Sequence, residues 1–455
     1  MKVNVARPPI HTHEGAIAQH INAEQQLRRC VMACMLWEDE FYESGESIAK
    51  RIAETIALVD PEKVAAIAIE ARSKMKLRHA PLLIAREMAR LPKHKGLVAT
   101  LLPQIIQRAD ELTEFVAIYW KDGRQKLSAQ VKKGLAAAFP RFDEYNLAKY
   151  NRDGAVKLRD VLFLSHAKPE DEAQAAIWKR LIDGALVTPD TWEVALSGGA
   201  DKKEAFTRLM AEKKLFALAF IRNLRNMAEA GVPKAVVSTY AETVDLSRVL
   251  PFRFIAAARA VPQWEDVIEP MLLRCCSIQQ KLPGKTVLVV DVSGSMYSGG
   301  NVSARSDMTR VDVAAALAAI CREICEEPAI YATAGDDRRR IHATATAPPR
   351  HGFALADVFS KKGFARTLGG GGIFLVQCLD WIKQREKTAD RVIVLTDEQD
   401  CDQKLNPASA DAFGAHNYIV NIASNKNGIA YDKFTHVNGW SEAVIDYIRA
   451  FESNQ

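Results

Sequence analysis

The 455-residue sequence lacks the features that mark several common classes of protein. No apolar run approaches the roughly 18–20 residues that a membrane-spanning helix needs, and the first residues hold no apolar signal-peptide core. The eight cysteines form no CxxC pair, so neither a disulfide framework nor a zinc ribbon is indicated. These absences predict a cytoplasmic protein that keeps its thiols reduced and does not contact a membrane.

Motifs of catalysis are also missing. The sequence contains no HExxH motif, and its serine-rich segment "VSGSM" is not the GxSxG of a nucleophile elbow. No nucleophile stands in a pattern with a base and a group that orients it. We therefore expect a protein that binds rather than an enzyme. A metal-dependent hydrolase using Asp291 and Asp397 is a minor alternative.

The first part of the chain has the periodicity of helices. Between about residues 20 and 280, apolar residues recur at i, i+3, i+4 and i+7, and Pro or Gly separates the segments, as in "RLPKHKG" and "AGVPKAV". This pattern predicts helical pairs stacked as a solenoid. The net charge of +5 comes from this part, which indicates an anionic partner.

At "KLPGKTVLVVDVS" the pattern changes to alternating strands and helices. We expect strands at 285–292, 329–334, 341–347, 391–397 and 417–423, and helices at 311–327, 373–386 and 440–452. Such alternation predicts a doubly wound, mostly parallel sheet. The expected fold is therefore multidomain, with an all-α domain at 1–283 followed by an α/β domain at 284–455.

Polar residues follow the first strand of this expected sheet directly. Asp291, Ser293 and Ser295 lie in "DVSGSM", and Asp397 ends the strand "RVIVLTD". Ligands of such sheets bind beyond the carboxyl ends of the strands. A carboxylate with two hydroxyls suits a hard divalent cation such as Mg²⁺, and Asp397 can hold a metal-bound water. A serine-rich turn without metal is the alternative.

The two motifs "DVSGSM" and "LTD" resemble the metal-ion-dependent adhesion site of a von Willebrand factor A domain. The resemblance implies a bound cation that keeps one position for the carboxylate of a partner. It also implies a threonine on a third loop. In the matching stretch "FARTLGGGGIFL" this threonine falls near Gly371 or Gly372, and Thr367 just upstream can replace it if the glycine run folds back.

Residues 120–170 interleave basic and aromatic side chains. Such a pattern is typical of a surface that contacts phosphates and stacks on bases. Solvated helix faces over aromatic core residues are the alternative. Tyr145, Tyr150 and Phe142 are the candidate stacking residues. The candidate RNA-binding residues are Lys132, Lys133, Arg141, Lys149, Arg152, Lys157, Arg159, His166 and Lys168.

The sequence of this region resembles the TROVE module of the Ro ribonucleoprotein family. The matching segments are "GLAAAFPRFDEYNLAKY" and "VKLRDVLFLSHAKP", and the resemblance continues through "VLPFRFIAAARAVPQ". The resemblance implies a ring of HEAT-like helical repeats closed by contacts with a von Willebrand A domain. It implies that small Y-type RNAs bind the outer surface at Lys149 and His166. A second basic contact of the family falls on Asp153, with Arg152 beside it.

The resemblance further implies a basic central hole that accepts single-stranded 3′ ends of misfolded or unprocessed RNAs. An exoribonuclease such as polynucleotide phosphorylase is an expected partner, and we expect the chain to be a monomer. The expected function is therefore RNA binding in RNA quality control or maturation. The second hypothesis is a metal-dependent protein-interaction adaptor, in which the helical part serves only as a scaffold.

Overall fold

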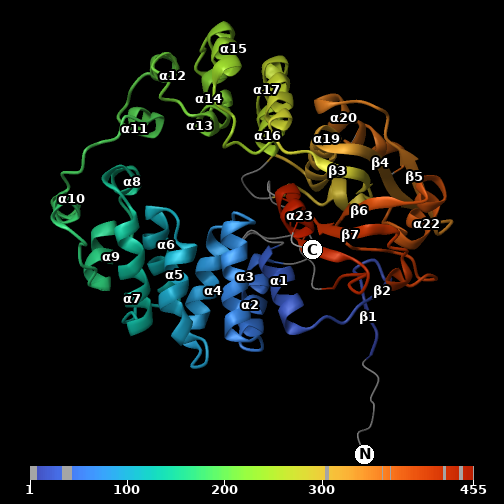
Figure 1. Ribbon diagram of the computed structural model, residues 1–455, viewed down its shortest axis with the longest axis horizontal. Coiled ribbons are helices and arrows are strands. Elements are labelled where there is room, and N and C mark those ends of the chain that lie inside the picture. Colours follow the sequence, from blue (N-terminus) through green and yellow to red (C-terminus); the bar gives the residue numbers. More distant parts are fainter. Residues whose placement is uncertain are drawn as a thin grey trace, which may run out of the picture. The chain divides into compact units, whose positions relative to one another are not determined.

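The computed structural model describes residues 8–32, 44–302, 307–360, 362–368, 370–423, 427–439 and 444–453. The chain divides into two compact units (Figure 1). Unit 1 comprises Met1–Ile48 with Phe216–Gln455, and unit 2 comprises Ala49–Leu215. Each unit is described by itself. Within the described residues, no helix is long and apolar enough to cross a membrane.

Unit 2 is built from consecutive helices, as the sequence predicts. After α2 (Gly45–Ile56), which leads into the unit, they are α3 (Pro61–Ser73), α4 (His79–Arg90), α5 (Val98–Ile105), α6 (Ala109–Tyr119), α7 (Ala129–Ala138), α8 (Glu144–Tyr150), α9 (Leu158–Ser165), α10 (Glu172–Asp183), α11 (Trp192–Ser197) and α12 (Lys202–Ala211). Neighbouring helices pack in pairs, among them α3 on α4, α5 on α7 and α7 on α9.

Side-chain caps set where many of these helices begin. The Ser128 hydroxyl accepts from the amide of Val131 at the start of α7, and the Asp143 carboxylate accepts from Asn146 at the start of α8. Such caps satisfy amides that have no partner inside the helix. The cap at Asp143 therefore fixes the residue at which α8 begins.

One buried carboxylate ties three helices of unit 2 together. Glu111 of α6 is fully buried and lies 2.8 Å from the Arg72 guanidinium of α3 and 3.3 Å from that of Arg78. Its other oxygen accepts from the amides of Gln107 and Arg108. A buried charge persists only when it is paired and hydrogen-bonded in this way, so Glu111 fixes the register of these helices.

Unit 1 combines helices with a six-stranded sheet. Its helices before the sheet are α1 (Ala23–Met32), α13 (Ala217–Arg222), α14 (Leu224–Glu229), α15 (Lys234–Thr243), α16 (Phe252–Ala260) and α17 (Glu265–Ser277), and the short strands β1 (Ile10–His11) and β2 (Ile17–Ala18) pair antiparallel. From 44 to 280 all described regular elements are helices, which confirms the helical prediction for that stretch.

The sheet has the strand order β5-β4-β3-β6-β7-β8. Its strands are β3 (Leu282–Asp291), β4 (Cys325–Asp336), β5 (Ile341–Thr346), β6 (Ala389–Thr396), β7 (Gly414–Asn421) and β8 (Thr435–Asn438). Only β5 runs antiparallel to its neighbour; the other pairs are parallel. The predicted mostly parallel α/β sheet is confirmed.

Helices cover both faces of this sheet, so it is doubly wound as predicted. They are α19 (Arg310–Ile324), α20 (Gly352–Phe359), α22 (Leu375–Glu386) and α23 (Val444–Glu452), with short α18 (Gly294–Ser298) and α21 (Phe364–Thr367) at the loops. Val289 of β3 and Val394 of β6 join the apolar cluster that includes α22. On the other face, the Tyr418 hydroxyl of β7 donates to Glu452 of α23 over 3.0 Å.

Three details of the sheet region differ from the sequence expectation. Helix α19 ends at Ile324, because β4 starts there rather than at 329 and continues the chain without a loop. Helix α20 and strand β8 have no counterpart in the prediction; β8 is only four residues long and lacks a clear alternating pattern. Residues 440–443 of the last expected helix lie outside the described residues.

The N-terminal segment of unit 1 docks on the loops of the C-terminal sheet. Arg29 of α1 is fully buried and donates to the Glu398 carboxylate over 2.7 Å and to the Tyr431 hydroxyl over 3.0 Å. The Tyr431 ring stacks on His436 with 3.7 Å between centroids. The Thr12 hydroxyl also donates to the Asp400 carbonyl over 2.7 Å.

Charge pairing overrides burial at this contact. Burial alone would raise the pKa of Glu398, but Arg29 and His436 outweigh it and lower that pKa to about 2. An exposed glutamate has a pKa of about 4.3. Because the folded-state pKa is the lower one, the pair stabilises unit 1 above pH about 4, and this contribution is lost as the pH falls towards 2.

We predict that Arg29→Met lowers the free energy of unfolding of unit 1 by about 3–5 kcal/mol, because it leaves Glu398 buried without its cation. Urea denaturation at pH 7 measures this loss. The matched control Arg28→Met removes the neighbouring, partly exposed arginine and should change stability by less than about 1 kcal/mol. Equal midpoints for the two variants would show that the buried pair does not hold α1 in place.

Candidate functional site

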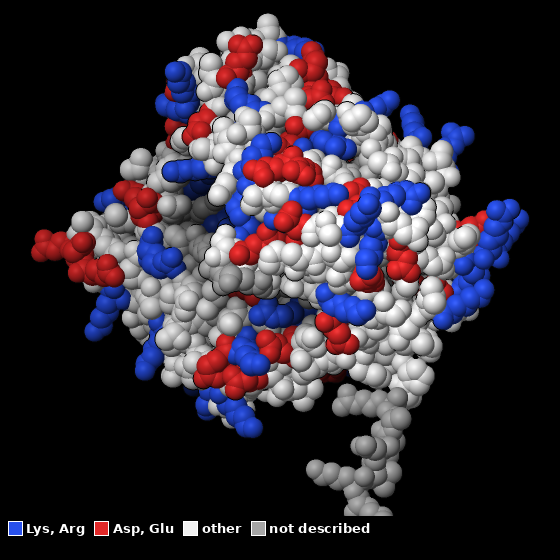
Figure 2. Space-filling view, turned by 45° about the vertical axis from the view of Figure 1, so that its right-hand side comes forward, with Lys and Arg blue, Asp and Glu red and all other residues white. Residues whose placement is uncertain are grey.

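The candidate basic residues lie on α7 to α9 of unit 2 and in the loops that follow these helices, and most of them face solvent. Lys132 and Lys133 lie on α7, Lys149 on α8 and Arg159 on α9. The exposed members of the predicted set are Lys133, Arg141, Arg152, Arg159, His166 and Lys168, and the half-buried ones are Lys132, Lys149 and Lys157. On the face shown in Figure 2, basic and acidic side chains are interspersed, so this face is not uniformly basic.

Lys149 is held between aromatic rings. Its ammonium lies 6.0 Å from the ring centroid of Tyr145 and 5.8 Å from that of Tyr150, and 3.6 Å from the Glu193 carboxylate. The Arg108 guanidinium lies 4.6 Å from the Tyr150 centroid. Cation–π contacts and one ion pair therefore orient Lys149 and leave the 45%-exposed Tyr145 open to a ligand.

His166 ends α9 in an unusual backbone conformation. Its φ of 56° and ψ of 36° lie in the left-handed region, and its ring is exposed. A non-glycine residue there costs roughly 1–2 kcal/mol. Its amide donates to the Phe163 carbonyl over 3.3 Å, which closes the helix end. The imidazole therefore projects from a turn at which glycine is the residue expected for stability.

Asp153, which stands where the family resemblance implies a basic residue, has a local role. Its carboxylate accepts from the Lys157 ammonium over 2.7 Å. This hydrogen bond, the charge of Lys157 and the charge of Arg159 lower the pKa of Asp153. Lys157 is thus partly neutralised, while among the described residues Arg152 and Arg159 form no direct ion pair with an acid.

The prediction that Phe142 stacks on bases is wrong, and several of the basic residues do not lie together. Phe142 is only 7% exposed, because it packs inside the unit, so it offers no stacking face. The Arg141 guanidinium donates to the Pro103 carbonyl. Within the part of the chain described, Lys132, Lys133 and Lys168 have no acidic partner and no contact with Lys149. The candidate residues thus form an extended surface rather than one pocket.

Two partners of this surface escaped the sequence analysis. Arg108 covers Tyr150 from α6's N-terminus, and Glu193 reaches Lys149 from α11. Both stand about forty residues away from the residues that they contact, so no local pattern marks them. Only the packing of α6, α8 and α11 reveals them.

The second candidate site lies at the carboxyl ends of β3 and β6 in unit 1. Asp291, Ser293, Ser295 and Asp397 are 0%, 1%, 6% and 1% exposed. The Ser293 amide donates to Asp291 over 2.8 Å, and the hydroxyls of Ser293 and Ser295 are 3.4 Å apart. The Thr396 hydroxyl donates to the other Asp291 oxygen over 2.7 Å. Parallel pairing of β3 with β6 brings the two predicted motifs together.

The acid pair at these strand ends is under electrostatic strain. Burial, and then the charge of Asp397, raise the pKa of Asp291 to about 7. Two carboxylates that repel in a buried site are a setting in which a bound cation lowers the free energy. The oxygen donors therefore fit a hard divalent ion, although the described residues hold no group of three His, Cys, Asp or Glu placed for a metal.

The glycine loop brings backbone to this site. The Gly370 carbonyl accepts from the Gly294 amide over 2.6 Å. A Cβ at Gly370 would overlap the Gly335 carbonyl oxygen, and a Cβ at Gly371, where the resemblance implies a threonine, would lie 2.4 Å from the Asp337 carboxylate. Thr367 lies on α21, where its hydroxyl donates to the Gly363 carbonyl over 3.4 Å, and in the described part of the chain it forms no hydrogen bond with Asp291. A ligand role for Thr367 therefore stays a prediction.

Asp400 is a buried acid that the sequence analysis did not single out. Its carboxylate accepts from the Leu375 amide over 2.7 Å and from the Asp402 amide over 2.7 Å. Burial raises the pKa of Asp400 to about 7 despite these bonds. It anchors the start of α22 beside the strand ends, a structural role that depends on a contact across 25 residues.

Comparison with known proteins defines the class. The family model described as the TROVE domain matches residues 179–353. The fold is similar to the crystal structure of the Deinococcus radiodurans Ro (RSR) protein, with a TM-score of 0.58 and 18% identity over 95% of this chain and 100% of that chain. A search of the curated proteins finds no match. The matched residues are less than half of the chain, and the fold has a helical part and an α/β part.

The chain therefore resembles the Ro ribonucleoprotein family in one segment of its sequence and in its fold. The likeness in structure, at 18% identity, concerns the fold. The TROVE match runs past residue 283, and the compact units divide the chain at other points. The predicted domain boundary at 283/284 therefore stays a prediction.

We predict that His166→Gly stabilises unit 2 by about 0.5–1 kcal/mol, because it removes left-handed strain that exceeds the entropic cost of glycine. Urea denaturation measures the gain. Lys213→Gly, at an exposed residue with φ of 54° outside the basic surface, is the matched control and should give a similar gain. A loss of stability in His166→Gly alone would mean that the imidazole itself supports the fold.

Proposed function

We propose that this protein binds RNA without catalysing its cleavage, and that it acts in RNA quality control or maturation in the cytoplasm. The observation that carries the proposal is the TROVE match together with the aromatic-framed Lys149 and the exposed His166. We further propose that small Y-type RNA binds at the surface around Lys149 and His166. Lysine and histidine contact phosphates or bases there, and Tyr145 supplies a stacking face.

The same proposal assigns single-stranded 3′ ends of misfolded or unprocessed RNAs to a basic hole in a ring of helical repeats. A narrow hole of this kind admits single strands and excludes duplexes, so it selects unpaired ends without reading bases. This step follows from the family resemblance. An exoribonuclease such as polynucleotide phosphorylase is the proposed partner, and the proposed state of the chain is a monomer.

We predict that Lys149→Ala with His166→Ala weakens small-RNA binding at least tenfold, since it removes the oriented cation and the imidazole together. The RNA that co-purifies with the protein at mild salt serves as the probe. Electrophoretic mobility shifts with this RNA measure the affinity of each variant. Affinity of the unchanged protein should also fall steeply between about 50 and 200 mM salt, as phosphate contacts require.

Lys179→Ala is the control for this pair, because Lys179 is an exposed lysine on α10 of the same unit. It should bind RNA within about twofold of the unchanged protein. Equal affinity of the double variant and the control would remove Lys149 and His166 from the interface. A flat salt response would argue against phosphate contacts altogether.

A second proposal concerns the strand ends of unit 1. We propose that Asp291, Ser293 and Ser295 bind a divalent cation, with Mg²⁺ as the expected ion and Asp397 holding its water. The raised pKa of Asp291 beside Asp397 supports it, because a cation relieves the repulsion between the two carboxylates. Such an ion leaves room for a partner's carboxylate, which is the adaptor function named as the alternative.

We predict that Mg²⁺ raises the melting temperature of the unchanged protein and of Asp380→Asn, whose site is exposed on α22, but not that of Asp291→Asn. Differential scanning fluorimetry with and without EDTA measures the shift. Without metal, Asp291→Asn should be at least as stable as the unchanged protein, because it removes a strained buried charge. The same Mg²⁺ response in both variants would reject the site.

A further inference from the structure

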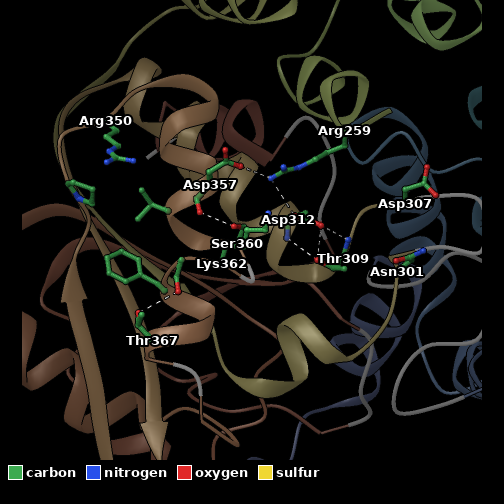
Figure 3. Close-up of a pocket in the computed structure, with 14 residues that line it drawn as sticks. Arg259, Asn301, Asp307, Thr309, Asp312, Arg350, Asp357, Ser360, Lys362 and Thr367 are labelled. Carbon is green, nitrogen blue, oxygen red and sulfur yellow. Dashed lines mark hydrogen bonds and ion pairs between the residues drawn. The ribbon is translucent and has the colours of Figure 1, made fainter. Parts of the chain in front are cut away.

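A cleft of about 950 Å³ opens in unit 1. Its walls come from α16, from the start of α19 and from the segment that includes α20 and α21 (Figure 3). This volume lies at the upper end of the range for small-molecule sites. The cleft therefore has room for a ligand of nucleotide size.

Each acidic residue of the cleft already has a cationic partner, and Asp312 and Asp357 share one arginine. Asp357 lies 3.2 Å and Asp312 lies 3.6 Å from the Arg259 guanidinium. Asp312 also accepts from the amide and hydroxyl of Thr309 over 2.9 and 2.8 Å. Asp307 pairs with Arg225 over 3.6 Å. These acids leave no free carboxylate pair, so the cleft does not suit a cation as ligand.

Two cations of the cleft remain free to bind. Arg350 and Lys362 are exposed, and neither has an acidic partner among the residues that the structure describes. In Figure 3, Arg350 lies on the side of the cleft opposite Asp307 and Asn301. These two unpaired cations are the groups of the cleft to which an anionic group of a ligand can bind.

An apolar wall adjoins these cations. Pro348, Val358 and Phe364 line the cleft, and Phe364 is half-buried. Its ring packs edge-to-face on the buried Phe359, with 5.6 Å between centroids, so it is held in place. A fixed, partly exposed aromatic ring beside two cations can stack a planar group whose other end is negatively charged.

The hydroxyl groups of the cleft supply acceptors. The Ser360 hydroxyl donates to the Asp357 carbonyl, Thr367 to the Gly363 carbonyl and Thr309 to Asp312. Because each hydroxyl proton is donated to an acceptor of the protein, the hydroxyl oxygens can accept hydrogen bonds from a ligand. Such acceptors suit the hydroxyls of a ribose or the amino group of a base.

We propose that this cleft binds a nucleoside phosphate, with the phosphate at Arg350 and Lys362 and the base against Phe364. An apolar ligand would leave the two cations without a partner, and inorganic phosphate alone would leave the aromatic wall unused. The nucleotide is either free or part of an RNA strand. The site is independent of the proposed RNA surface, since its lining residues all belong to unit 1.

Isothermal titration calorimetry of the RNA-free, full-length protein tests this proposal with four probes: AMP, adenosine, inorganic phosphate and hexa-adenylate. We expect AMP to bind at least tenfold more tightly than adenosine or phosphate. Arg350→Gln with Lys362→Gln should weaken AMP at least tenfold. Phe364→Leu should weaken AMP and leave phosphate unchanged. Lys404→Gln, an exposed lysine of the same unit outside the cleft, should match the unchanged protein.

The four probes distinguish a free nucleotide from a nucleotide that is part of an RNA strand. If both AMP and hexa-adenylate bind the unchanged protein, and both bind Arg350→Gln with Lys362→Gln more weakly, the cleft takes free nucleotides. If only hexa-adenylate binds the unchanged protein, and this variant weakens it, the cleft takes a nucleotide that is part of an RNA strand. If that variant keeps the affinity of both probes within twofold, or if neither probe binds, the proposal is wrong. Lys149→Ala with His166→Ala should keep AMP affinity, so failure of the RNA surface and failure of the cleft are distinguishable. Melting curves verify that each variant is folded.

Discussion

Parallel pairing of β3 with β6 is the constraint on which unit 1 depends. It places the ends of two strands next to each other, although more than one hundred residues of chain separate them. As a result Asp291 and Asp397 meet in a buried site, and the pKa of Asp291 rises to about 7. The hydroxyls of Thr396, Ser293 and Ser295 surround the pair but do not neutralise it. The strain is confined to the place where such sheets bind ligands.

A second buried charge is handled in the opposite way. Glu398 follows Asp397 directly, yet its pKa falls to about 2 because Arg29 and His436 face it. Neighbouring acids in one loop thus have opposite roles. The first contributes to a site that gains from a cation, while the second fastens the N-terminal helix to the sheet. Their environments, rather than their residue type, decide the difference.

The functional surfaces are divided between the units. Unit 2 presents Lys149 and His166 on short capped helices, and unit 1 presents the strand-end site and the cleft beside Arg350. In the two proposals made above, unit 2 contacts RNA and unit 1 binds a small anionic ligand. The two surfaces share no residue, so variants at one leave the chemistry of the other unchanged.

The sequence by itself determined the types of element and the local motifs. Helix caps such as Ser128 and Asp143, the apolar strand before Asp291 and the "LTD" end of β6 act over a few residues, so local pattern is sufficient to find them. The tertiary structure alone decided that Phe142 is buried, that Arg108 covers Tyr150 and that Gly370 packs on Gly335. It also decided that Arg29 pairs with Glu398 across 369 residues. Burial and long-range pairing depend on which elements come together in space, and no periodicity within one segment encodes that choice.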